Sequence, residues 1–531
     1  MPKVLITDNV ASEGIDLLQK RVPVDIKRGL SPDELIATIP DYDALVVRSE
    51  TKVTEPVIAA GENLKVIARA GIGVDNIDLD AATRAGVAVV NAPIGNTVAA
   101  AEHTMALMLA LARNVPQAYA SMKKGQWQRS AFMGIEVRNK TLGIIGLGRV
   151  GSEVARRAAS FGMRLIAFDP FVAPDFAARL GVAVMSLDEL LPQADFITLH
   201  TPLTPGTAKL ISAPQLAKMK PGARLINVAR GELVDEEAVL DALENEHLGG
   251  AALDVFTNEP PGDLPLLKHP RLVATPHLGA STEEAQREVA IEAAEQVLAV
   301  LDGQPARNTV NAPFVPPEVH AILAPYVPVA SMVGRLLTNL AAESGASRQM
   351  TGVTLRYQGE IAGHSTAILK AAALVGLLGP VSGEAVNLIN APVLAQQRGL
   401  QIIEQTSADS REYASLISAT LHTAGDDITL AGTSLRDEPH LVRVNEYWMD
   451  VAPSTPYLLF VDNQDQPGVV GAVGTVSGRH NVNISFMEVG RIAPRGQAMM
   501  VLGVDDPIPH DVLAEIKALP QVDNARVVSM R

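Results

Sequence analysis

One stretch of the sequence, Thr141 to Gly151, constrains the fold of this chain more than any other, and it reads TLGIIGLGRVG. An apolar run with the character of a β-strand enters the pattern Gly146-x-Gly148-x-x-Gly151, and apolar residues at helical spacing follow it. In this context the glycines permit a tight turn, close approach of a pyrophosphate and close packing of helix on strand. The helix N-terminus would attract the diphosphate through its positive partial charge. The sequence therefore predicts a dinucleotide-binding loop.

Asp169 indicates which dinucleotide to expect. It ends a second predicted strand, 164–168, and follows Gly146 at roughly the 20-residue spacing typical of a ribose-binding acid. Its carboxylate would accept hydrogen bonds from the adenosine ribose hydroxyls and would repel a 2′-phosphate. We therefore expect NAD as the cofactor rather than NADP.

Length and composition narrow the class of protein. A chain of 531 residues is too long for one hydrophobic core, and its net charge of −15 argues against binding to nucleic acid. The absence of cysteine excludes disulfides and thiolate chemistry, and we expect no metal site. The first residues contain no signal-type apolar core, and the longest apolar runs fall short of the ~20 residues that span a bilayer. These features predict a cytoplasmic protein with no nucleic-acid or membrane partner.

The position of the glycine loop indicates a split domain. Roughly 100 residues with α/β character precede it, including apolar strands at 4–7, 44–47 and 65–68 and a helix announced by the capping box Ser31 to Glu34. We therefore expect a Rossmann-type NAD domain inserted into a flavodoxin-like α/β substrate domain, with the active site in the cleft between them. In the NAD domain we expect six strands alternating with helices. The predicted crossings are helices 98–112 and 283–301; the predicted domains are 1–97 with 286–312 for substrate and 98–285 for NAD.

Three residues near predicted strand ends form a candidate catalytic set. Oxidation of a 2-hydroxy acid needs a base for the hydroxyl proton and a cation for the carboxylate. His277 suits the base, Glu259 would fix its tautomer, and Arg230 offers a planar cationic fork. Taken singly, each residue could equally be structural: a histidine after a strand, an arginine in a surface turn, an acid in a loop.

Several segments resemble the D-isomer-specific 2-hydroxyacid dehydrogenase family. They are GLGRVG at 146, HTPLT at 200, NVARGELVD at 227, AALDVFTNEP at 251 and TPHLGAST at 275. With VVRSETKV at 46, AGIGVDNIDL at 70 and the C-terminal modules, the chain resembles the long-type branch that oxidises 3-phospho-D-glycerate. The resemblance implies that Arg230, Glu259 and His277 are catalytic. It also implies cofactor contacts at Gly146, Gly148, Arg149, Val150, Gly151, Asp169, Thr201, Val228, Ala229, Arg230, Asp254, His277, Gly279 and Ala280.

The resemblance places the substrate at residues of both domains. It implies contacts at Arg48, Arg69, Ile72, Gly73, Arg230 and His277. Glu50 stands where some relatives carry a second arginine, so we expect the phosphate to be held by Arg69 or by a base such as Lys140. We expect Asn96 to be a helix cap and His103 a core residue.

The C-terminal third forms two further units. The proline-rich segment 308–317 marks a boundary, and the resemblance implies an α+β intervening domain over 313–453. The strand and helix patterns of 454–531 spell βαββαβ, a ferredoxin-like unit that resembles the ACT regulatory domain. This second resemblance implies that Asn463, Asp465 and Asn483 bind an amino acid across a pair of such domains.

The expected function is NAD-dependent oxidation of 3-phospho-D-glycerate to 3-phosphooxypyruvate, the first step of L-serine biosynthesis, with feedback by L-serine. The expected assembly is a homo-oligomer, a tetramer. Two alternatives stay open: a dehydrogenase of another D-2-hydroxy acid, such as glycerate or lactate, and a non-catalytic NAD-sensing protein on the same scaffold.

Overall fold

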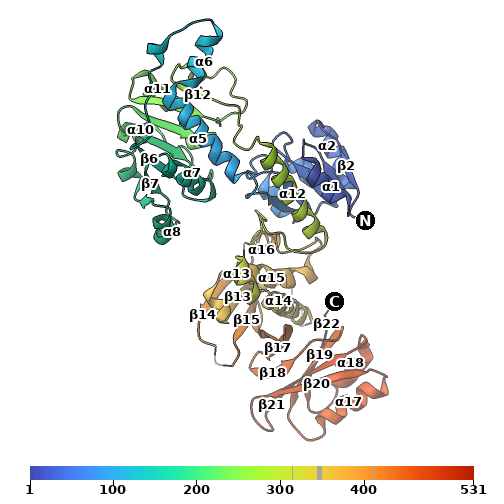
Figure 1. The fold of residues 1–531 in the computed structure, drawn as a ribbon. Helices are drawn as coiled ribbons and strands as arrows, with labels where there is room; N and C mark the ends of the chain where they lie inside the picture. Colours follow the sequence, from blue (N-terminus) through green and yellow to red (C-terminus); the bar gives the residue numbers. More distant parts are fainter. Residues whose placement is uncertain (314, 344–349, 411, 531) are drawn as a thin grey trace.

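The computed structural model describes residues 1–313, 315–343, 350–410 and 412–530. The described chain contains four β-sheets, which Figure 1 colours along the sequence from blue for the N-terminal sheet to red for the C-terminal one. This arrangement confirms the predicted α/β class with its inserted Rossmann-type unit and its ferredoxin-like tail. No helix among the described residues is long and apolar enough to cross a membrane.

The first sheet is parallel and has the strand order β2-β1-β3-β4-β5, which is the flavodoxin-like order. Two of its strands, β2 and β5, were not predicted, and β2 lacks a clear pattern because it is a partly exposed edge strand. The strands are β1 (Val4–Ile6), β2 (Val24–Ile26), β3 (Ala44–Val47), β4 (Val66–Arg69) and β5 (Ala88–Asn91).

Helices cover both faces of this sheet. The Ser31 hydroxyl accepts from the Glu34 amide and the Glu34 carboxylate from the Ser31 amide, which confirms the predicted capping box. One face is buried by a helix from far along the chain, α12, through residues such as Val289, Ala293 and Val297. The helices are α1 (Ser12–Gln19), α2 (Pro32–Thr38), η1 (Ile39–Asp41), α3 (Glu55–Ala60), α4 (Leu79–Arg84) and α12 (Glu283–Leu301).

The second sheet, also parallel, has the order β12-β11-β10-β9-β6-β7-β8, so the chain winds outward in both directions from β6. The expected count of six strands is wrong, because the two-residue β8 adds an exposed edge strand too short to show a pattern. The strands are β6 (Thr141–Ile145), β7 (Arg164–Phe168), β8 (Ala183–Val184), β9 (Phe196–Leu199), β10 (Ala223–Asn227), β11 (Leu248–Leu253) and β12 (Leu272–Ala274).

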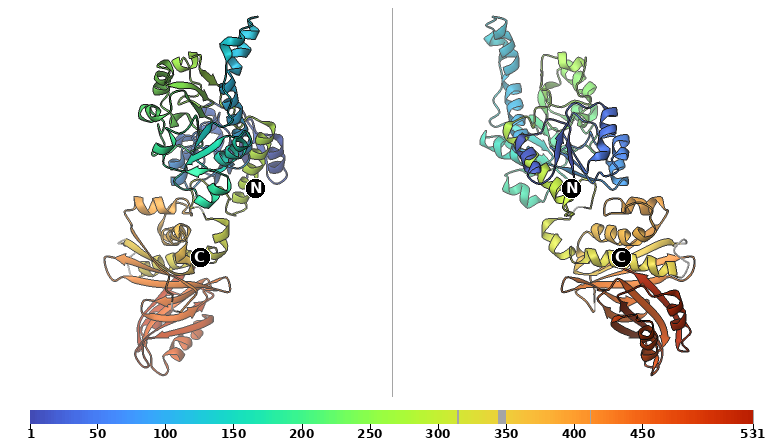
Figure 2. Two further views of the ribbon diagram at one scale, coloured as in Figure 1. Left: turned by 60° about the vertical axis from the view of Figure 1, so that its left-hand side comes forward. Right: turned by 90° about the vertical axis from the view of Figure 1, so that its right-hand side faces the viewer.

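Helices surround this second sheet, and α5 links it to the first. Figure 2 shows α6 and the segment after it projecting as an arm. The helices are α5 (Thr97–Arg113), α6 (Val115–Lys123), η2 (Arg129–Phe132), α7 (Arg149–Ser160), α8 (Pro174–Arg179), α9 (Leu187–Leu190), α10 (Ala213–Lys218), η3 (Gly231–Leu233), α11 (Glu236–Glu244) and η4 (Pro265–Lys268).

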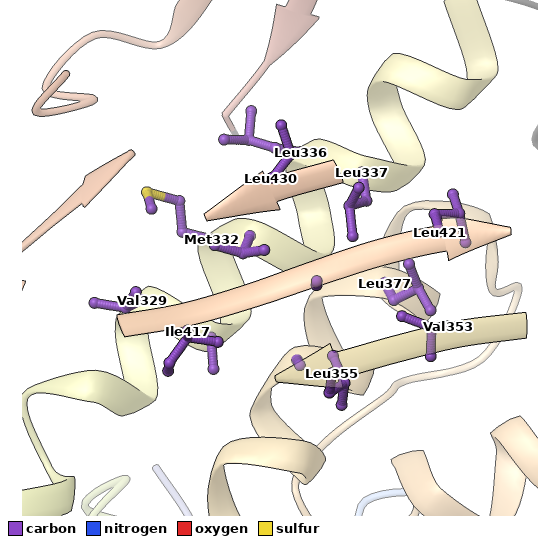
Figure 3. Packing of buried hydrophobic residues seen from close by; sticks show 14 of the residues in the cluster. Val329, Met332, Leu336, Leu337, Val353, Leu355, Leu377, Ile417, Leu421 and Leu430 are labelled. Carbon is purple, nitrogen blue, oxygen red and sulfur yellow. The ribbon is translucent and has the colours of Figure 1, made fainter. Parts of the chain in front are cut away.

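The third sheet packs one face against two helices, α14 and α15, and Figure 3 shows the core between them. Two glycines allow the helices to approach closely. A Cβ at Gly334 would overlap the Ala373 carbonyl, and a Cβ at Gly376 would overlap the Ser331 carbonyl. The strand order is β14-β13-β15-β16-β17-β18. The elements are α13 (Pro317–Leu323), α14 (Tyr326–Glu343), β13 (Met350–Gly359), η6 (Glu360–Gly363), α15 (Ala367–Leu378), η7 (Gly379–Val381), α16 (Ala391–Gln397), β14 (Gln401–Ser407), β15 (Ser415–Thr423), β16 (Ile428–Leu435), β17 (Glu438–Val444) and β18 (Tyr447–Val451).

The fourth sheet is antiparallel, with the order β20-β21-β19-β22. Two helices, α17 and α18, contribute to a core on one of its faces. This confirms the predicted βαββαβ sequence. The elements are β19 (Tyr457–Gln464), α17 (Val469–Arg479), β20 (Ile484–Arg491), β21 (Gln497–Val504), α18 (His510–Lys517) and β22 (Val522–Ser529).

Candidate active site

The glycine loop between β6 and α7 has the geometry that a pyrophosphate needs. Gly146 has φ +93°, and a Cβ there would lie 2.7 Å from the His200 carbonyl oxygen. A Cβ on Gly148, the N-cap of α7, would meet open space, whereas one on Gly151 would overlap the Gly146 carbonyl. The first glycine thus makes the turn, the second leaves room for a ligand and the third lets helix and strand touch.

Asp169 lies at the mouth of this loop. Its Oδ2 accepts from the Leu147 amide at 2.8 Å and its Oδ1 from the Phe171 amide at 2.9 Å. Each oxygen keeps a lone pair for a ribose hydroxyl. Across the loop, the Thr201 hydroxyl is buried with no partner among the described residues, as a group facing a ligand would be. These residues fit the adenosine half of NAD.

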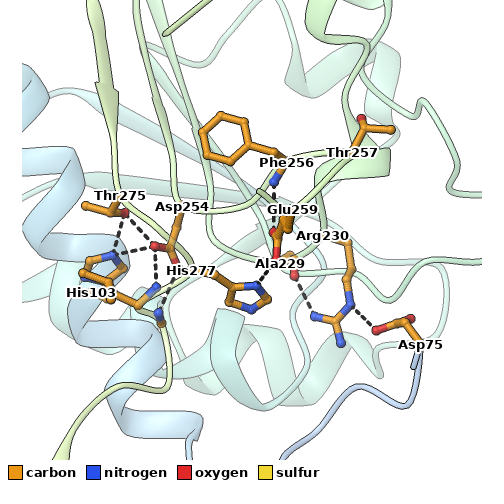
Figure 4. Close-up of polar contacts among 12 residues, drawn as sticks. Asp75, His103, Ala229, Arg230, Asp254, Phe256, Thr257, Glu259, Thr275 and His277 are labelled. Atoms are coloured by element: carbon orange, nitrogen blue, oxygen red, sulfur yellow. Dashed lines mark hydrogen bonds and ion pairs between the residues drawn. The ribbon is translucent and has the colours of Figure 1, made fainter. Parts of the chain in front are cut away.

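Glu259 and His277 form a close pair. The Glu259 Oε2 lies 2.6 Å from the His277 Nδ1, and its Oε1 accepts from the Phe256 amide at 3.1 Å (Figure 4). The carboxylate therefore holds the proton on Nδ1. Within the described part of the chain His277 Nε2 has no hydrogen-bond partner, so it is left as the acceptor.

The backbone around His277 is held by Asp254, whose side chain is fully buried. The His277 amide donates to the Asp254 carbonyl at 2.8 Å, and the next two amides, of Leu278 and Gly279, donate to its carboxylate at 2.7 and 2.8 Å. Three successive amides around one acidic residue stabilise the φ of +54° that His277 adopts. Desolvation raises the pKa of Asp254, but hydrogen bonds, first that of His103, outweigh it and lower the pKa.

His103 on α5 completes this network, which the sequence did not predict. Its Nε2 lies 3.1 Å from both Asp254 Oδ1 and the Thr275 hydroxyl. Asn96 is the N-cap residue of α5, as expected from the sequence, but its side chain makes no cap hydrogen bond.

Three arginines from two sheets lie close together: Arg230 follows β10 of the sheet that also precedes His277, whereas Arg69 and Arg48 lie at the ends of β4 and β3. Arg230 donates through Nε to Asp75 at 3.1 Å and through Nη1 to the Ala229 carbonyl at 2.7 Å. Burial, together with the charges of Arg230 and Arg48, lowers the pKa of Arg69 to about 10. Burial also lowers the pKa of Arg48, while nearby Glu50 opposes that shift. The three cations are close enough to repel, so the arrangement favours an anion.

A glycine turn separates two of these arginines. A Cβ at Gly71 would overlap the Arg69 guanidinium, and one at Gly73 would overlap that of Arg230. The amides of Ile72 and Gly73 have no acceptor among the described residues, so they are available to a carboxylate.

Lys140 does not reach this cleft within its own chain. It precedes β6 at the end opposite the glycine loop. Burial there acts to raise the pKa of Asp195, but hydrogen bonds of Thr141 and Lys220 and the charges of Lys220 and Lys140 lower it. The suggestion that it holds the substrate phosphate is therefore not supported by this chain.

The predicted effector residues do not converge within one chain. Asp465 follows the end of β19, whereas Asn483 precedes β20, and both strands begin opposite Val504 of β21. The two side chains thus lie at opposite ends of the sheet. Asp465 accepts from Arg491 Nη1 at 3.0 Å and Asn483 donates to Asp505 at 2.6 Å. Asn463 is buried, and its Oδ1 has no partner among the described residues.

The sheet order, the glycine loop and the Glu259–His277 pair define an NAD-dependent dehydrogenase of the 2-hydroxyacid class. Residues 105–279 match the D-isomer specific 2-hydroxyacid dehydrogenase NAD-binding domain. Residues 322–445 match the D-3-phosphoglycerate dehydrogenase intervening domain, and residues 457–521 match the ACT domain. The chain belongs to the D-3-phosphoglycerate dehydrogenase family.

Similar proteins share the full length of the chain. D-3-phosphoglycerate dehydrogenase of Synechocystis sp. is 46% identical, with 100% of this chain and 95% of that protein covered. The enzyme of the same name from Methanocaldococcus jannaschii is 42% identical, with both chains covered completely. A solved structure of D-lactate dehydrogenase from Aquifex aeolicus, complexed with NAD and lactic acid, is 29% identical with a TM-score of 0.53 and covers 58% of this chain and 99% of its own.

Proposed function

We propose that the chain oxidises 3-phospho-D-glycerate to 3-phosphooxypyruvate with NAD, the first step of L-serine biosynthesis. The observation that carries the proposal is the 2.6 Å Glu259–His277 pair together with the group of Arg230, Arg69 and Arg48. Relatives named D-3-phosphoglycerate dehydrogenase, matched over the full chain, support the choice of substrate.

We infer a task for each residue. His277 Nε2 takes the hydroxyl proton, and Glu259 stabilises the imidazolium that forms. When NAD is bound, its nicotinamide supplies the acceptor for the hydride. The Gly146–Gly151 loop, Asp169 and Thr201 would hold the adenosine and pyrophosphate, and segments 228–230 and 277–280 would flank the nicotinamide.

Arg230 binds the substrate carboxylate. Asp75, an exposed carboxylate 3.1 Å from Arg230 Nε, marks where an anionic oxygen fits against the fork. The free amides of the glycine turn would share that carboxylate, and Arg69 and Arg48 would hold the phosphate at the other end.

A panel of D-2-hydroxy acids tests the function. NADH formation is measured with 3-phospho-D-glycerate, D-glycerate and D-lactate at equal concentration. We expect the phosphorylated acid to give the highest kcat/KM. A preference for glycerate or lactate would assign the chain to another dehydrogenase, and NAD binding without turnover of any acid would favour the sensor alternative.

We also propose a cytoplasmic homo-oligomer, a tetramer. The arm of α6 and the segment after it supports assembly, because Tyr119, Trp127 and Met133 are 64%, 76% and 84% exposed. Sedimentation of the full chain measures the assembly. A monomer at micromolar concentration would contradict the proposal.

L-serine is the proposed feedback effector. β20 is an edge strand of its sheet, and pairing of two such strands around a two-fold axis would bring Asn483 of one copy near Arg491 and Asp465 of the other. Calorimetric titration of L-serine tests this. Binding should be lost in Asp465→Ala and kept in Lys517→Ala, a change at the end of α18.

A further inference from the structure

The substrate turn is held in place from one strand end. The Ala92 amide donates to the Gly71 carbonyl at 2.9 Å, and the Asn91 side-chain amide donates to the Ile72 carbonyl at 2.6 Å. Asn91 is the last residue of β5. Because these bonds engage the turn carbonyls, the amides of the same peptide units point the other way, toward the cleft.

Residues outside the first sheet hold Asn91 in place through hydrogen bonds. Gln296 on α12 is 4% exposed, and its Nε2 donates to the Asn91 carbonyl at 2.6 Å. The Gln296 Oε1 accepts from the backbone amide of Asn308 at 2.8 Å. The backbone carbonyl of Asn308 in turn accepts from the backbone amide of Asn91 at 3.3 Å. Both hydrogen-bonding ends of Gln296 are therefore used to join Asn91 to residue 308.

The segment 308–311 continues this support along β5. Thr309 pairs antiparallel with Val90, and the Val310 amide donates to the Val89 carbonyl at 2.7 Å. The Asn311 side chain accepts from the Val89 amide at 2.9 Å. This segment is the chain's path from the first sheet to the C-terminal sheets, so its position and that of the substrate turn are linked through β5.

We propose that Asn91 is a positioning residue for the substrate turn, and that Gln296 and segment 308–311 hold Asn91 in place. The inference rests on the proposed function, since it takes the turn to bind the substrate carboxylate. An anion site of backbone amides depends on sub-ångström placement, so release of the Ile72 carbonyl weakens substrate binding without touching the acid–base pair.

Asn91→Ala tests the role. We expect the KM for 3-phospho-D-glycerate to rise about tenfold, which is the effect of one lost hydrogen bond of ordinary strength. The kcat should change less, and the Kd for NAD should stay unchanged. Asn63→Ala is the matched control, because it removes a 2.9 Å amide-to-carbonyl bond to Pro40 at the opposite end of the same sheet. Its constants should equal those of the wild type.

Gln296→Met is the second variant, and it decides the matter if Asn91→Ala does not fold. It keeps an uncharged side chain of similar length but has neither the donor for the Asn91 carbonyl nor the acceptor for the Asn308 amide, so the KM should rise in the same direction by a smaller factor. A folded variant of either kind with the wild-type KM overturns the proposal, as does a Kd for NAD weakened by the same factor. Failure of the proposed function would show separately, as a wild-type enzyme without turnover of this substrate.

Discussion

His103 Nε2 lies 3.1 Å from the Asp254 Oδ1, although the two residues are 151 positions apart in the chain. The contact joins α5, which links the two parallel sheets, to the carboxylate that holds the backbone of His277. The part-buried hydrogen bond thus connects the link helix to the residue that fixes the backbone of His277.

Replacement of His103 should slow the reaction. His103→Ala leaves the fully buried Asp254 with one donor fewer, and we expect kcat to fall about tenfold. His103→Gln returns a donor and should recover part of the loss. Steady-state kinetics measures both, and equal rates for the alanine variant and the wild type would exclude the link.

Replacement of His277 should remove most of the turnover. We expect His277→Ala to lower kcat by about 10²- to 10⁴-fold, because the base is lost. NAD should still bind, since the Gly146 loop and Asp169 hold the adenosine half. Single-turnover rates and NAD titration check the two parts, and near-normal turnover would show that His277 is not the base.

Asp169 should set the preference for NAD. In the wild type the 2′-phosphate of NADP would face the Asp169 carboxylate, which accepts a 2.8 Å hydrogen bond from the Leu147 amide. Because the two negative charges repel, NADP should be used poorly. Asp169→Ala removes that repulsion and should narrow the ratio of kcat/KM for NAD to that for NADP. Comparable efficiency with both cofactors in the wild type would refute this role.

His200 should make the protein less stable in mild acid. Burial lowers the pKa of His200 from 6.5 to about 3, so the unfolded chain binds this proton at a higher pH than the folded chain does. Stability therefore falls as pH decreases from about 6.5 toward 3. Between about pH 7.5 and 5.5 the wild type should lose about 1 kcal/mol more free energy of unfolding than His200→Gln. Urea unfolding at both pH values measures the difference, and equal losses would contradict the assignment.

Local signals in the sequence were enough for much of the fold. The predicted bounds of helix 283–301 match α12, because Thr282 provides an N-cap that accepts from the Ala285 amide. The proximity of Glu259 and His277 could be predicted because parallel strands bring their carboxyl ends to one edge of the sheet; their catalytic role stays a prediction.

The remaining features depend on partners distant in the chain. Asn91 looks like the polar end of a strand until Gln296, 205 positions later, is placed beside it. His103 has the pattern of a core residue, and only the fold reveals the carboxylate opposite it. The effector pair shows the limit in another way: Asp465 and Asn483 each match a motif, but the strand register separates them within one chain.

The burial of the first sheet by α12 has a consequence for the order in which the protein folds on the ribosome. Val289, Ala293 and Val297 complete a core whose other half, including Val4 and Val46, is synthesised first. Roughly 200 residues must follow β5 before α12 appears, which takes about 10–40 s at ordinary rates of translation. During that interval one face of the first sheet lacks its cover, while the second sheet is already complete once β12 has been made. The inserted unit should therefore fold before the unit that surrounds it, and nascent chains stopped before residue 283 should resist protease there but be cut within the first 91 residues.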